Sequence, residues 1–377
     1  MTGLVCAEQL AKNPKVDEVV LADMRLDAAR SMMERTKSGK MSVKKVNGTN
    51  GSDVQRLLRG ADVVVSSMPW GLNGLVLEKA MNAGTDYVDF CMVVESMQAY
   101  GKLAKRVESS GITALTAMGE DPGISDSMAN YAASKLDEPM ESRVMDGDSG
   151  VAKGLDFFSL WSPQDLLEET TVPAAVFRNG KMIFVPPLHE REIYEFPPPL
   201  GPLPVYQTNH EETYLMPQFI KGLRNADFRI AIDDDFAKAA KTLRKIGMHG
   251  LKPISVKGVM VRPLDVVVAL MPRPVDTSGK VKGYACVVVE VTGLKDGEKK
   301  TVKMWTMMSH EKAYELCKTN ATGYIVGVGG AVATEMLIEG EVRKKGLFVA
   351  EQLDSKKLLA RLPAKRLKVE EKVISHR

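Results

Sequence analysis

Short apolar runs alternate with helical stretches through the first 117 residues, and this alternation constrains the fold more than any other feature. Strands are expected at residues 16–23, 41–46, 61–68, 87–90 and 112–117, with helices at 4–12, 26–33, 71–83 and 95–109. The run at 61–68, ADVVVSSM, is almost wholly apolar, as expected when helices cover both faces of a sheet. Strands that alternate with helices predict a parallel, doubly wound α/β sheet.

After about residue 125 the rhythm changes to an α+β pattern. Alternating strands are expected at 264–270, 284–292 and 301–308, and the turn at 295–297 should join the last two as a hairpin. Seven prolines between residues 186 and 204 predict a stiff extended connector that is neither helix nor central strand. Residues 310–340 are predicted to be helical, and the basic segment after Asp354 a solvated helix.

Composition excludes several classes of protein. Fifty-one basic and 48 acidic side chains give a net charge of +3, too balanced for a nucleic-acid partner. No apolar run reaches the ~18 residues that a membrane span needs, and no signal peptide is recognisable. The four cysteines form no CxxC pair, which argues against a metal site or a disulfide framework and fits the cytoplasm.

The first strand and helix carry the spacing of a dinucleotide site. Gly3 precedes the helix at 4–12, and the next strand ends in Asp23, 20 residues later. This matches the distance from a dinucleotide-binding glycine turn to the carboxylate that binds the adenosine ribose. The Asp23 carboxylate would repel the extra phosphate of NADP, so NAD is the expected cofactor. Arg25 could receive that phosphate, which keeps NADP open.

Further cofactor contacts are expected where the later strands end, because open α/β sheets bind ligands at their carboxyl edge. The candidates are Ser66, Ser67, Pro69 and Asp89. A structural interpretation stays open, with the two serines as helix caps or turn formers and Trp70 in the core. The GVGG sequence at 327–330 resembles a phosphate loop, but it lies within a helical pattern, which favours close helix packing.

The chain opens inside the glycine turn, since Gly3 fits the third glycine of G-x-G-x-x-G. In a Rossmann sheet the first strand lies between the second and the fourth. The strands at 16–23 and 61–68 would therefore each face a missing partner, with unpaired backbone groups at about 1–3 kcal/mol each. We therefore expect Met1 to be an internal methionine of a reading frame that is roughly ten residues longer. If the short chain is real, a catalytically silent dinucleotide-binding protein gains support.

Residues 118–125, MGEDPGIS, resemble the Asp-Pro-Gly-Ile turn of saccharopine reductases, which leads from the last Rossmann strand into the substrate domain. Segments 61–70, 158–163 (FSLWSP), 178–181 (RNGK) and 321–348 are similar, in the same order, to further segments of that family. Lysine 6-dehydrogenases share this layout. The order and spacing of these motifs over roughly residues 1–350 identify the chain as a member of the saccharopine dehydrogenase family.

The resemblance implies a Rossmann domain and an α+β domain whose sheet commonly forms a homodimer, with the substrate between them. It also implies NAD(P)-dependent hydride transfer at a carbon that bears nitrogen, through an imine. The corresponding domains are residues 1–125 with 321–350 for the dinucleotide, 126–320 for the substrate, and a basic tail, 351–377.

Carried over by position, Asp121 would orient or deprotonate a substrate ammonium, and an N-cap role for it stays open. Trp161 would wall the substrate pocket, with Gly147 and Asp148 near it.

Asn209-His210-Glu211-Glu212 stands where saccharopine reductases typically show Asn-Arg-Asp-Ser, whose arginine grips a substrate carboxylate. The resemblance makes His210 a candidate catalytic residue and Glu211 a candidate substrate ligand, although a plain loop histidine stays open. A histidine and two acids suit a cationic substrate with an amine at both ends or on a side chain, as in lysine. Lysine 6-dehydrogenases tend to show Ala-Pro-Gly in place of Asp121-Pro122-Gly123, so neither activity fits fully.

We therefore expect an amino-acid oxidoreductase acting on a carbon–nitrogen bond, of the saccharopine or lysine 6-dehydrogenase type. One alternative is an imine reductase of polyamine precursors, such as carboxynorspermidine or homospermidine formation. The other is a silent dinucleotide-binding protein.

Overall fold

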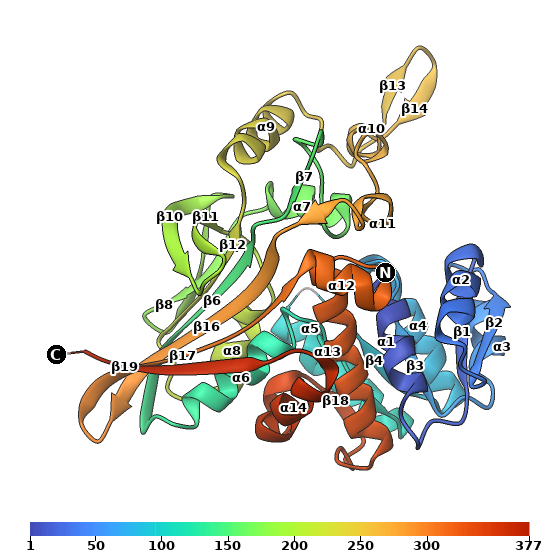
Figure 1. The fold of residues 1–377 in the computed structure, drawn as a ribbon, viewed down its shortest axis with the longest axis horizontal. Helices are drawn as coiled ribbons and strands as arrows, with labels where there is room; N and C mark the ends of the chain where they lie inside the picture. Colours follow the sequence, from blue (N-terminus) through green and yellow to red (C-terminus); the bar gives the residue numbers. More distant parts are fainter. Residues whose placement is uncertain (95, 377) are drawn as a thin grey trace. The chain divides into compact units, whose positions relative to one another are not determined.

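The computed structural model describes residues 1–94 and 96–376, which form two compact units (Figure 1). Unit 1 comprises Met1–Tyr131 and Tyr324–Lys368, and unit 2 comprises Ala132–Gly323 and Val369–Arg377. The parallel sheet of unit 1 and the mainly antiparallel sheet of unit 2 confirm the predicted fold class.

Unit 1 contains a parallel four-stranded sheet in the order β18-β5-β4-β3 and a separate parallel pair, β1-β2. Its strands are β1 (Val19–Asp23), β2 (Met41–Lys45), β3 (Val63–Ser66), β4 (Asp86–Asp89), β5 (Thr113–Leu115) and β18 (Gly346–Phe348). The helices that lie in it or lead out of it are α1 (Thr2–Ala11), α2 (Asp27–Thr36), α3 (Gly51–Leu58), α4 (Trp70–Ala83), α5 (Met97–Ser110), α6 (Ile124–Ala133), α13 (Ala321–Ile338) and α14 (Ser355–Arg361). The alternation read from the sequence is confirmed; of the helix expected at 95–109, Glu95 lies outside the described residues.

The parallel strands of unit 1 form two separate sheets, and the break lies between β1 and β3. Within the described residues, β3 pairs only with β4 and β1 only with β2. This is the arrangement expected from the sequence, in which these two strands each lack one partner.

Helix α13 is the apolar centre of unit 1, and its glycines permit close packing. A Cβ atom on Gly329 would lie 2.2 Å from the Gly119 carbonyl oxygen, and one on Gly330 would lie 2.1 Å from the Phe90 ring. The packing role predicted for these glycines is therefore confirmed. By length and composition α13 could cross a membrane, which corrects our reading that no run is long enough. Because 83% of it is buried in the protein, it is weak evidence for a membrane span.

Unit 2 is built on a nine-stranded sheet in the order β10-β11-β12-β6-β16-β17-β19, with β8 joining β12 to β9. Its strands are β6 (Glu138–Asp148), β8 (Ala174–Arg178), β9 (Lys181–Val185), β10 (His189–Phe196), β11 (Gly201–Gln207), β12 (Asn225–Ala231), β16 (Tyr284–Lys295), β17 (Glu298–Ser309) and β19 (Val369–Ser375). Two short pairs stand apart, β7 (Val151–Ala152) with β15 (Val281–Lys282), and β13 (Ile254–Val256) with β14 (Val259–Val261). The helices are α7 (Pro163–Glu169), α8 (Glu212–Phe219), α9 (Asp234–Lys245), α10 (Pro263–Leu270), α11 (Pro274–Thr277) and α12 (His310–Cys317).

Three sequence predictions for residues after 185 are corrected. The apolar run at 264–270 is helix α10 rather than a strand, because Pro263 occupies the first turn and Asp265 the acidic position there. The proline-rich segment is not a plain connector, since it contributes the hairpin β10-β11. The segment after Asp354 is not a solvated helix. Leu358 and Leu359 of α14 and Leu362 at its C-terminal end are buried, and the following strand β19 pairs with β17.

Candidate active site

The end of β1 and the start of α1 form the predicted cofactor edge of unit 1. A Cβ atom on Gly3 would lie 2.3 Å from Ser67 Oγ, so α1 approaches the end of β3 closely at this glycine. Asp23 ends β1, and its Oδ1 accepts a hydrogen bond of 2.8 Å from the Arg25 backbone N–H. Both side chains are exposed, so either is available to a ribose or its phosphate.

The last residue of β3 and the loop after it supply three of the other predicted contacts. Ser67 and Pro69 are exposed, whereas Ser66 is buried and donates a 2.7 Å hydrogen bond to Asn73 Oδ1 in α4. Trp70 is 41% exposed and donates from Nε1 to the Met92 carbonyl oxygen, so it is not a core residue. Ser66 therefore positions α4, while Ser67 and Pro69 face outward.

Asp89 at the end of β4 is fully buried. Its carboxylate accepts hydrogen bonds from the Tyr87 hydroxyl, the Thr116 hydroxyl and the Ala117 backbone N–H, at 2.7–2.9 Å. These bonds hold the loop that follows β5, which indicates a positioning role for Asp89 rather than direct contact with a cofactor.

The Asp-Pro-Gly turn lies directly after that loop. Gly123 has a φ of 130°, and a Cβ atom there would lie 2.6 Å from the Gly119 backbone N and O atoms. The Gly123 N–H donates to Asp126 Oδ2 at 2.8 Å, and the Gly119 N–H donates to the Pro122 carbonyl at 2.7 Å. These constraints fix the turn, in which Asp121 is half-exposed.

This edge fits the adenosine half of a dinucleotide. The glycine needed for a close helix–strand approach, the ribose-binding carboxylate and an outward-facing loop after the next strand are all present. When bound, the cofactor supplies the redox chemistry, and Asp23 would hold the ribose.

A second group of functional side chains gathers in unit 2, at the start of α8. The His210 ring stacks on Phe228 of β12, with ring centroids 3.9 Å apart. Its Nδ1 bonds to the carboxylate of Glu212, which is fully buried, and lies 3.6 Å from Glu211 Oε2. The predicted pair, His210 and Glu211, therefore lies together.

The titration of this group is strongly perturbed. Burial alone would lower the pKa of His210, but the carboxylates of Glu212, Glu211 and Glu169 raise that pKa to about 10. Burial raises the pKa of Glu169 to about 8, against the opposing charge of His210. Burial and the neighbouring Asp148 carboxylate raise the pKa of Asp146 to about 7. We name Asp146, Glu169, His210, Glu211 and Glu212 the acidic cluster.

The acidic cluster retains unused hydrogen-bonding capacity. Within the cluster, Glu169 Oε2 is buried without a hydrogen-bond partner among the described residues, and so are the hydroxyl oxygens of Thr208 and Thr213, which flank residues 210–212 in the chain. Buried acceptors left in this state cost free energy, so a ligand that donates hydrogen bonds would be favoured there. A substrate ammonium satisfies that need and also neutralises charge.

Asp148 is oriented by a buried histidine. The Ala321 N–H donates to His310 Nδ1 at 3.1 Å, which leaves the proton on Nε2, and Nε2 bonds to Asp148 Oδ1 at 3.1 Å. The Gly150 N–H donates to the same oxygen at 2.6 Å. Asp146 and Asp148 lie two residues apart on β6, so their side chains leave the same face of the sheet.

Gly147 does not belong with these residues. It lies between Asp146 and Asp148 on β6 and faces the opposite side, where a Cβ atom would lie 2.4 Å from the Phe196 ring. This close approach gives Gly147 a packing role, while its predicted place near the substrate stays a prediction. Trp161 is half-buried and packs beside Leu160 and Val281.

Three further residues were missed from the sequence: Asp146, Glu169 and His310. Asp146 could have been found from its period-two spacing to Asp148, whereas no motif marks Glu169 or His310.

No metal site was predicted, but His210, Glu211 and Glu212 offer ligand atoms within 4.8 Å of one another. This spacing would also admit a metal ion. The buried pair of His210 with Glu212 already balances one charge of the group, and the prediction that the protein needs no metal stays untested.

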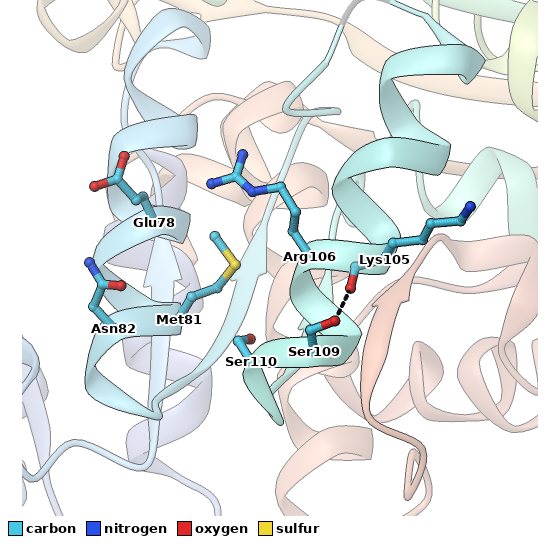
Figure 2. A pocket seen from close by; sticks show the side chains of 7 residues that line it. All are labelled: Glu78, Met81, Asn82, Lys105, Arg106, Ser109 and Ser110. Atoms are coloured by element: carbon cyan, nitrogen blue, oxygen red, sulfur yellow. Dashed lines mark hydrogen bonds between the residues drawn. The ribbon is translucent and has the colours of Figure 1, made fainter.

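A groove of about 470 Å³ between α4 and α5 shares no residue with either group. Figure 2 shows Glu78, Met81 and Asn82 of α4 opposite Lys105 and Arg106 of α5. These residues occupy the C-terminal halves of helices that run back from the carboxyl edge of the sheet. The groove therefore lies toward the other edge from the predicted cofactor site.

Comparison with known families defines the class of protein. Residues 1–115 match the saccharopine dehydrogenase NADP binding domain, and residues 119–367 match the saccharopine dehydrogenase C-terminal domain. The chain belongs to the saccharopine dehydrogenase family, and it is an oxidoreductase with an NAD(P)-binding domain.

Several relatives span nearly the whole chain. Carboxynorspermidine synthase of Vibrio alginolyticus is 28% identical and carboxyaminopropylagmatine dehydrogenase of Synechocystis 23% identical, each over 96% of this chain and 92% of the relative. Mitochondrial alpha-aminoadipic semialdehyde synthase of Rattus norvegicus is 25% identical, but the match covers only 47% of this chain and 19% of the length of that protein.

Solved structures support the fold. Saccharopine dehydrogenase (L-Glu forming) of Saccharomyces cerevisiae matches with a TM-score of 0.75 at 18% identity, over 99% of this chain and 98% of that one. Homospermidine synthase of Legionella pneumophila, in complex with NAD, matches with a TM-score of 0.70 at 14% identity, over 99% and 90%.

Proposed function

We propose that this protein reduces an imine formed between an amine of a polyamine precursor and a carboxylated aldehyde, with NAD(P)H as the reductant. The product would be a carboxylated secondary amine. The sequence analysis gave this activity, an imine reductase of polyamine precursors, as an alternative to the lysine and saccharopine activities. The observation that carries it is the acidic cluster, of which His210, Glu211 and Glu212 stand where a carboxylate-binding arginine was expected.

The near full-length relatives agree with this choice, since both printed names describe carboxylated polyamine compounds. Disconnecting the secondary amine in those names yields a diamine or agmatine and an amino acid that carries an aldehyde. A diamine is cationic at both ends near neutral pH. Glu169, Glu211 and Glu212 can bind one end as an ammonium, which leaves the other end to react as a free amine.

The reaction balances without any further co-reactant. The free amine nitrogen attacks the aldehyde carbon, water leaves, and a C=N bond forms. A hydride then reaches the imine carbon while a proton reaches nitrogen. Protein groups need to orient the amine and move protons, and the resemblance gives Asp121 this role. Asp146, with its pKa raised to about 7, is a second group able to hold a proton near neutral pH.

A substrate panel tests the proposal. We expect oxidation of NADPH or NADH, followed at 340 nm, with a diamine or agmatine plus an amino-acid semialdehyde. We expect little turnover of lysine or saccharopine with either oxidised cofactor. Robust turnover of saccharopine, with none of the amine–aldehyde pairs, would overturn the proposal.

Two variants connect the activity to the acidic cluster. Glu169→Gln should raise KM for the diamine at least tenfold, about 1.4 kcal/mol of lost binding, while KM for the aldehyde stays unchanged. Glu168→Gln is the matched control, because the neighbouring Glu168 bonds to Gln164 outside the cluster. A protein that is stabilised against heat by NAD or NADP but turns over no pair would be the silent alternative.

A further inference from the structure

One segment of unit 2 exposes a dense set of apolar side chains. Of the twenty large hydrophobic residues exposed in the described chain, nine lie within residues 246–275. They are Ile246, Leu251, Ile254, Val256, Val259, Met260, Val266, Leu270 and Val275, and Leu270 reaches 81% exposure. Scattered exposed apolar residues need no explanation, but a concentration of this kind marks an interaction surface.

The centre of this segment is the hairpin β13-β14, which we call the arm (Figure 1). The cross-strand pairs are Ile254 with Val261 and Val256 with Val259, so one face of the arm consists of four aliphatic side chains. All residues from 251 to 260 are exposed, and β13 and β14 pair only with each other within the described chain. An isolated two-stranded hairpin is marginally stable in water, so the arm needs a surface to pack on.

The positive charge of the arm favours a packing surface that carries carboxylates. Lys257 and Gly258 form the tip of the arm, with φ angles of 50° and 84°. Neither Lys252 nor Lys257 has an ion pair among the described residues, whereas Arg262 is paired with Asp265. The arm therefore presents an aliphatic face with unpaired positive charge at its tip and base.

A complementary surface lies on the sheet of the same unit. A hollow of about 360 Å³ is lined by residues that include Glu141, Arg143, Glu190, Glu192, Asp227 and Arg229. Arg229 is buried and paired with Glu190 and Asp227, and Arg143 is paired with Glu192.

Two carboxylates in the hollow can still accept hydrogen bonds from a partner. Glu141 lies in β6, and its side chain has no hydrogen bond or ion pair among the described residues. Asp227 is 9% exposed, and its Oδ1 is buried without a hydrogen bond, 3.5 Å from Arg143 Nε. Exposed Ile183 lies opposite Val176, which lines the hollow, so an apolar side chain flanks these charges.

We propose that the arm of one copy of this chain docks on the sheet of a second copy, with Lys257 in the hollow beside Glu141 and Asp227. The aliphatic face of the arm then packs on the apolar residues beside the hollow. A two-fold arrangement buries two such contacts, because each copy carries both an arm and a hollow. Such a contact would produce a homodimer, the assembly that the family resemblance implies.

An anionic membrane is the competing occupant, and the tip of the arm disfavours it. Insertion of the arm would carry Lys257 first into the apolar layer, where a lysine charge is costly. In the hollow the same ammonium meets carboxylate oxygens that lack hydrogen bonds.

Cysteine trapping between chains tests the contact. Protein with Lys257→Cys is mixed with protein with Glu141→Cys under mild oxidation. We expect a disulfide-linked dimer that mass spectrometry assigns to residues 257 and 141. The mixture of Lys282→Cys with Glu141→Cys is the matched control and should stay monomeric on a non-reducing gel. Failure to trap the 257–141 pair above this control overturns the proposal.

Sedimentation measures the contribution of the arm. Val256→Asp with Val259→Asp should raise the dimer dissociation constant at least tenfold, which corresponds to about 1.4 kcal/mol. Val172→Asp, at an exposed valine outside the arm, should leave it unchanged. A wild-type chain that stays monomeric, or a double variant that dimerises normally, contradicts the proposal. Co-sedimentation of a monomeric wild-type chain with phosphatidylglycerol vesicles, lost in the double variant, would assign the arm to membranes instead.

Discussion

At the scale of single residues, the acidic cluster lowers the stability of the free protein and favours the binding of a cationic ligand. The Glu169 carboxyl is uncharged in the folded protein until the pH approaches 8, although an exposed glutamate ionises near 4.5. Ionising it in place leaves a buried charge that the neighbouring His210 only partly balances. A cationic ligand removes this penalty, so the same group that weakens the free protein strengthens the complex.

Glu169→Gln should therefore stabilise the free protein at high pH. Because the folded pKa lies above the unfolded one, the unfolded state binds fewer protons between about pH 4.5 and 8, and stability falls across this window. The variant lacks that loss and should be more stable by at least about 1 kcal/mol at pH 9. Urea unfolding at pH 4 and pH 9 measures this. Equal stability at pH 9 would show that Glu169 is not held in its neutral form.

Asp121→Asn should lower turnover by about 10²-fold or more if Asp121 transfers a proton with the substrate amine. The motivation is its half-exposed place in the constrained Asp-Pro-Gly turn. Steady-state kinetics with saturating substrates and a melting curve distinguish the two roles. Normal turnover with a loss of about 1 kcal/mol of stability would instead show a helix-capping residue.

Asp23 should make the protein favour NAD over NADP, since its exposed carboxylate repels a 2′-phosphate. The comparison is the ratio of Michaelis constants for the two cofactors in the wild type and in Asp23→Ala. We expect the ratio to move toward NADP by about tenfold in the variant. A wild-type preference for NADP that Asp23→Ala leaves unchanged would refute the assignment, and Arg25→Ala would then be tested in the same way.

Sequence reasoning reached only part of the candidate site. His210, Glu211 and Asp148 were found because a known motif or its departure marks their positions. Asp146 and Glu169 were missed because their importance comes from burial beside other charges, which depends on tertiary structure. Gly147 was carried over from the family resemblance together with Asp148, although adjacent residues on a strand face opposite ways.

At the scale of elements, most helices and strands of unit 1 were predictable from the sequence, whereas those of unit 2 were predictable only in part. β1, β3, β4 and β5 coincide with short runs that alternate with helices, a pattern that identifies both type and position. β18 was not predicted, because its three residues lie far along the chain from the other strands of the sheet. In unit 2 the run at 264–270 is equally apolar, and its length of seven residues fits a strand or a helix. Pro202 and Pro204 are tolerated in β11 because they share one side of the strand, and pairing with β12 begins only at Val205.

Gly329→Ala tests the contact between α13 and the Asp-Pro-Gly turn. The new Cβ atom would lie 2.2 Å from the Gly119 carbonyl oxygen, so helix or turn must shift. We expect a loss of about 1–3 kcal/mol in stability by chemical denaturation. Gly101→Ala in α5 is the matched control, because its Cβ atom meets nothing within 4 Å and alanine favours helix by about 1 kcal/mol. A neutral Gly329→Ala would show that the contact is loose.

At the scale of the whole molecule, neither unit is a continuous stretch of chain. Unit 1 takes α14 and β18 from residues far beyond its first segment, and unit 2 takes β19 from residues beyond those. β19 pairs with β17 over seven residues and covers an edge of the sheet that carries the acidic cluster.

A chain ending at Lys368 should therefore lose stability in unit 2 while unit 1 still binds the dinucleotide. Removal of β19 leaves the outer backbone groups of β17 without their strand partner and exposes an edge that can pair with other chains. We expect aggregation or a lower melting temperature, with NAD binding by fluorescence retained. A chain that lacks only Arg377 is the control. Normal solubility and melting of the shorter chain would show that β19 is dispensable.

The position of β19 also sets the order in which a newly made chain can mature. Translation proceeds at about 5–20 residues per second, so β17 leaves the ribosome several seconds before residues 369–375. Through this interval the nascent substrate sheet has an unpaired edge, which chaperones or other nascent chains can bind. Completion of this sheet thus waits on residues made after those of the dinucleotide-binding unit, and production of active protein is sensitive to any delay in that final stretch.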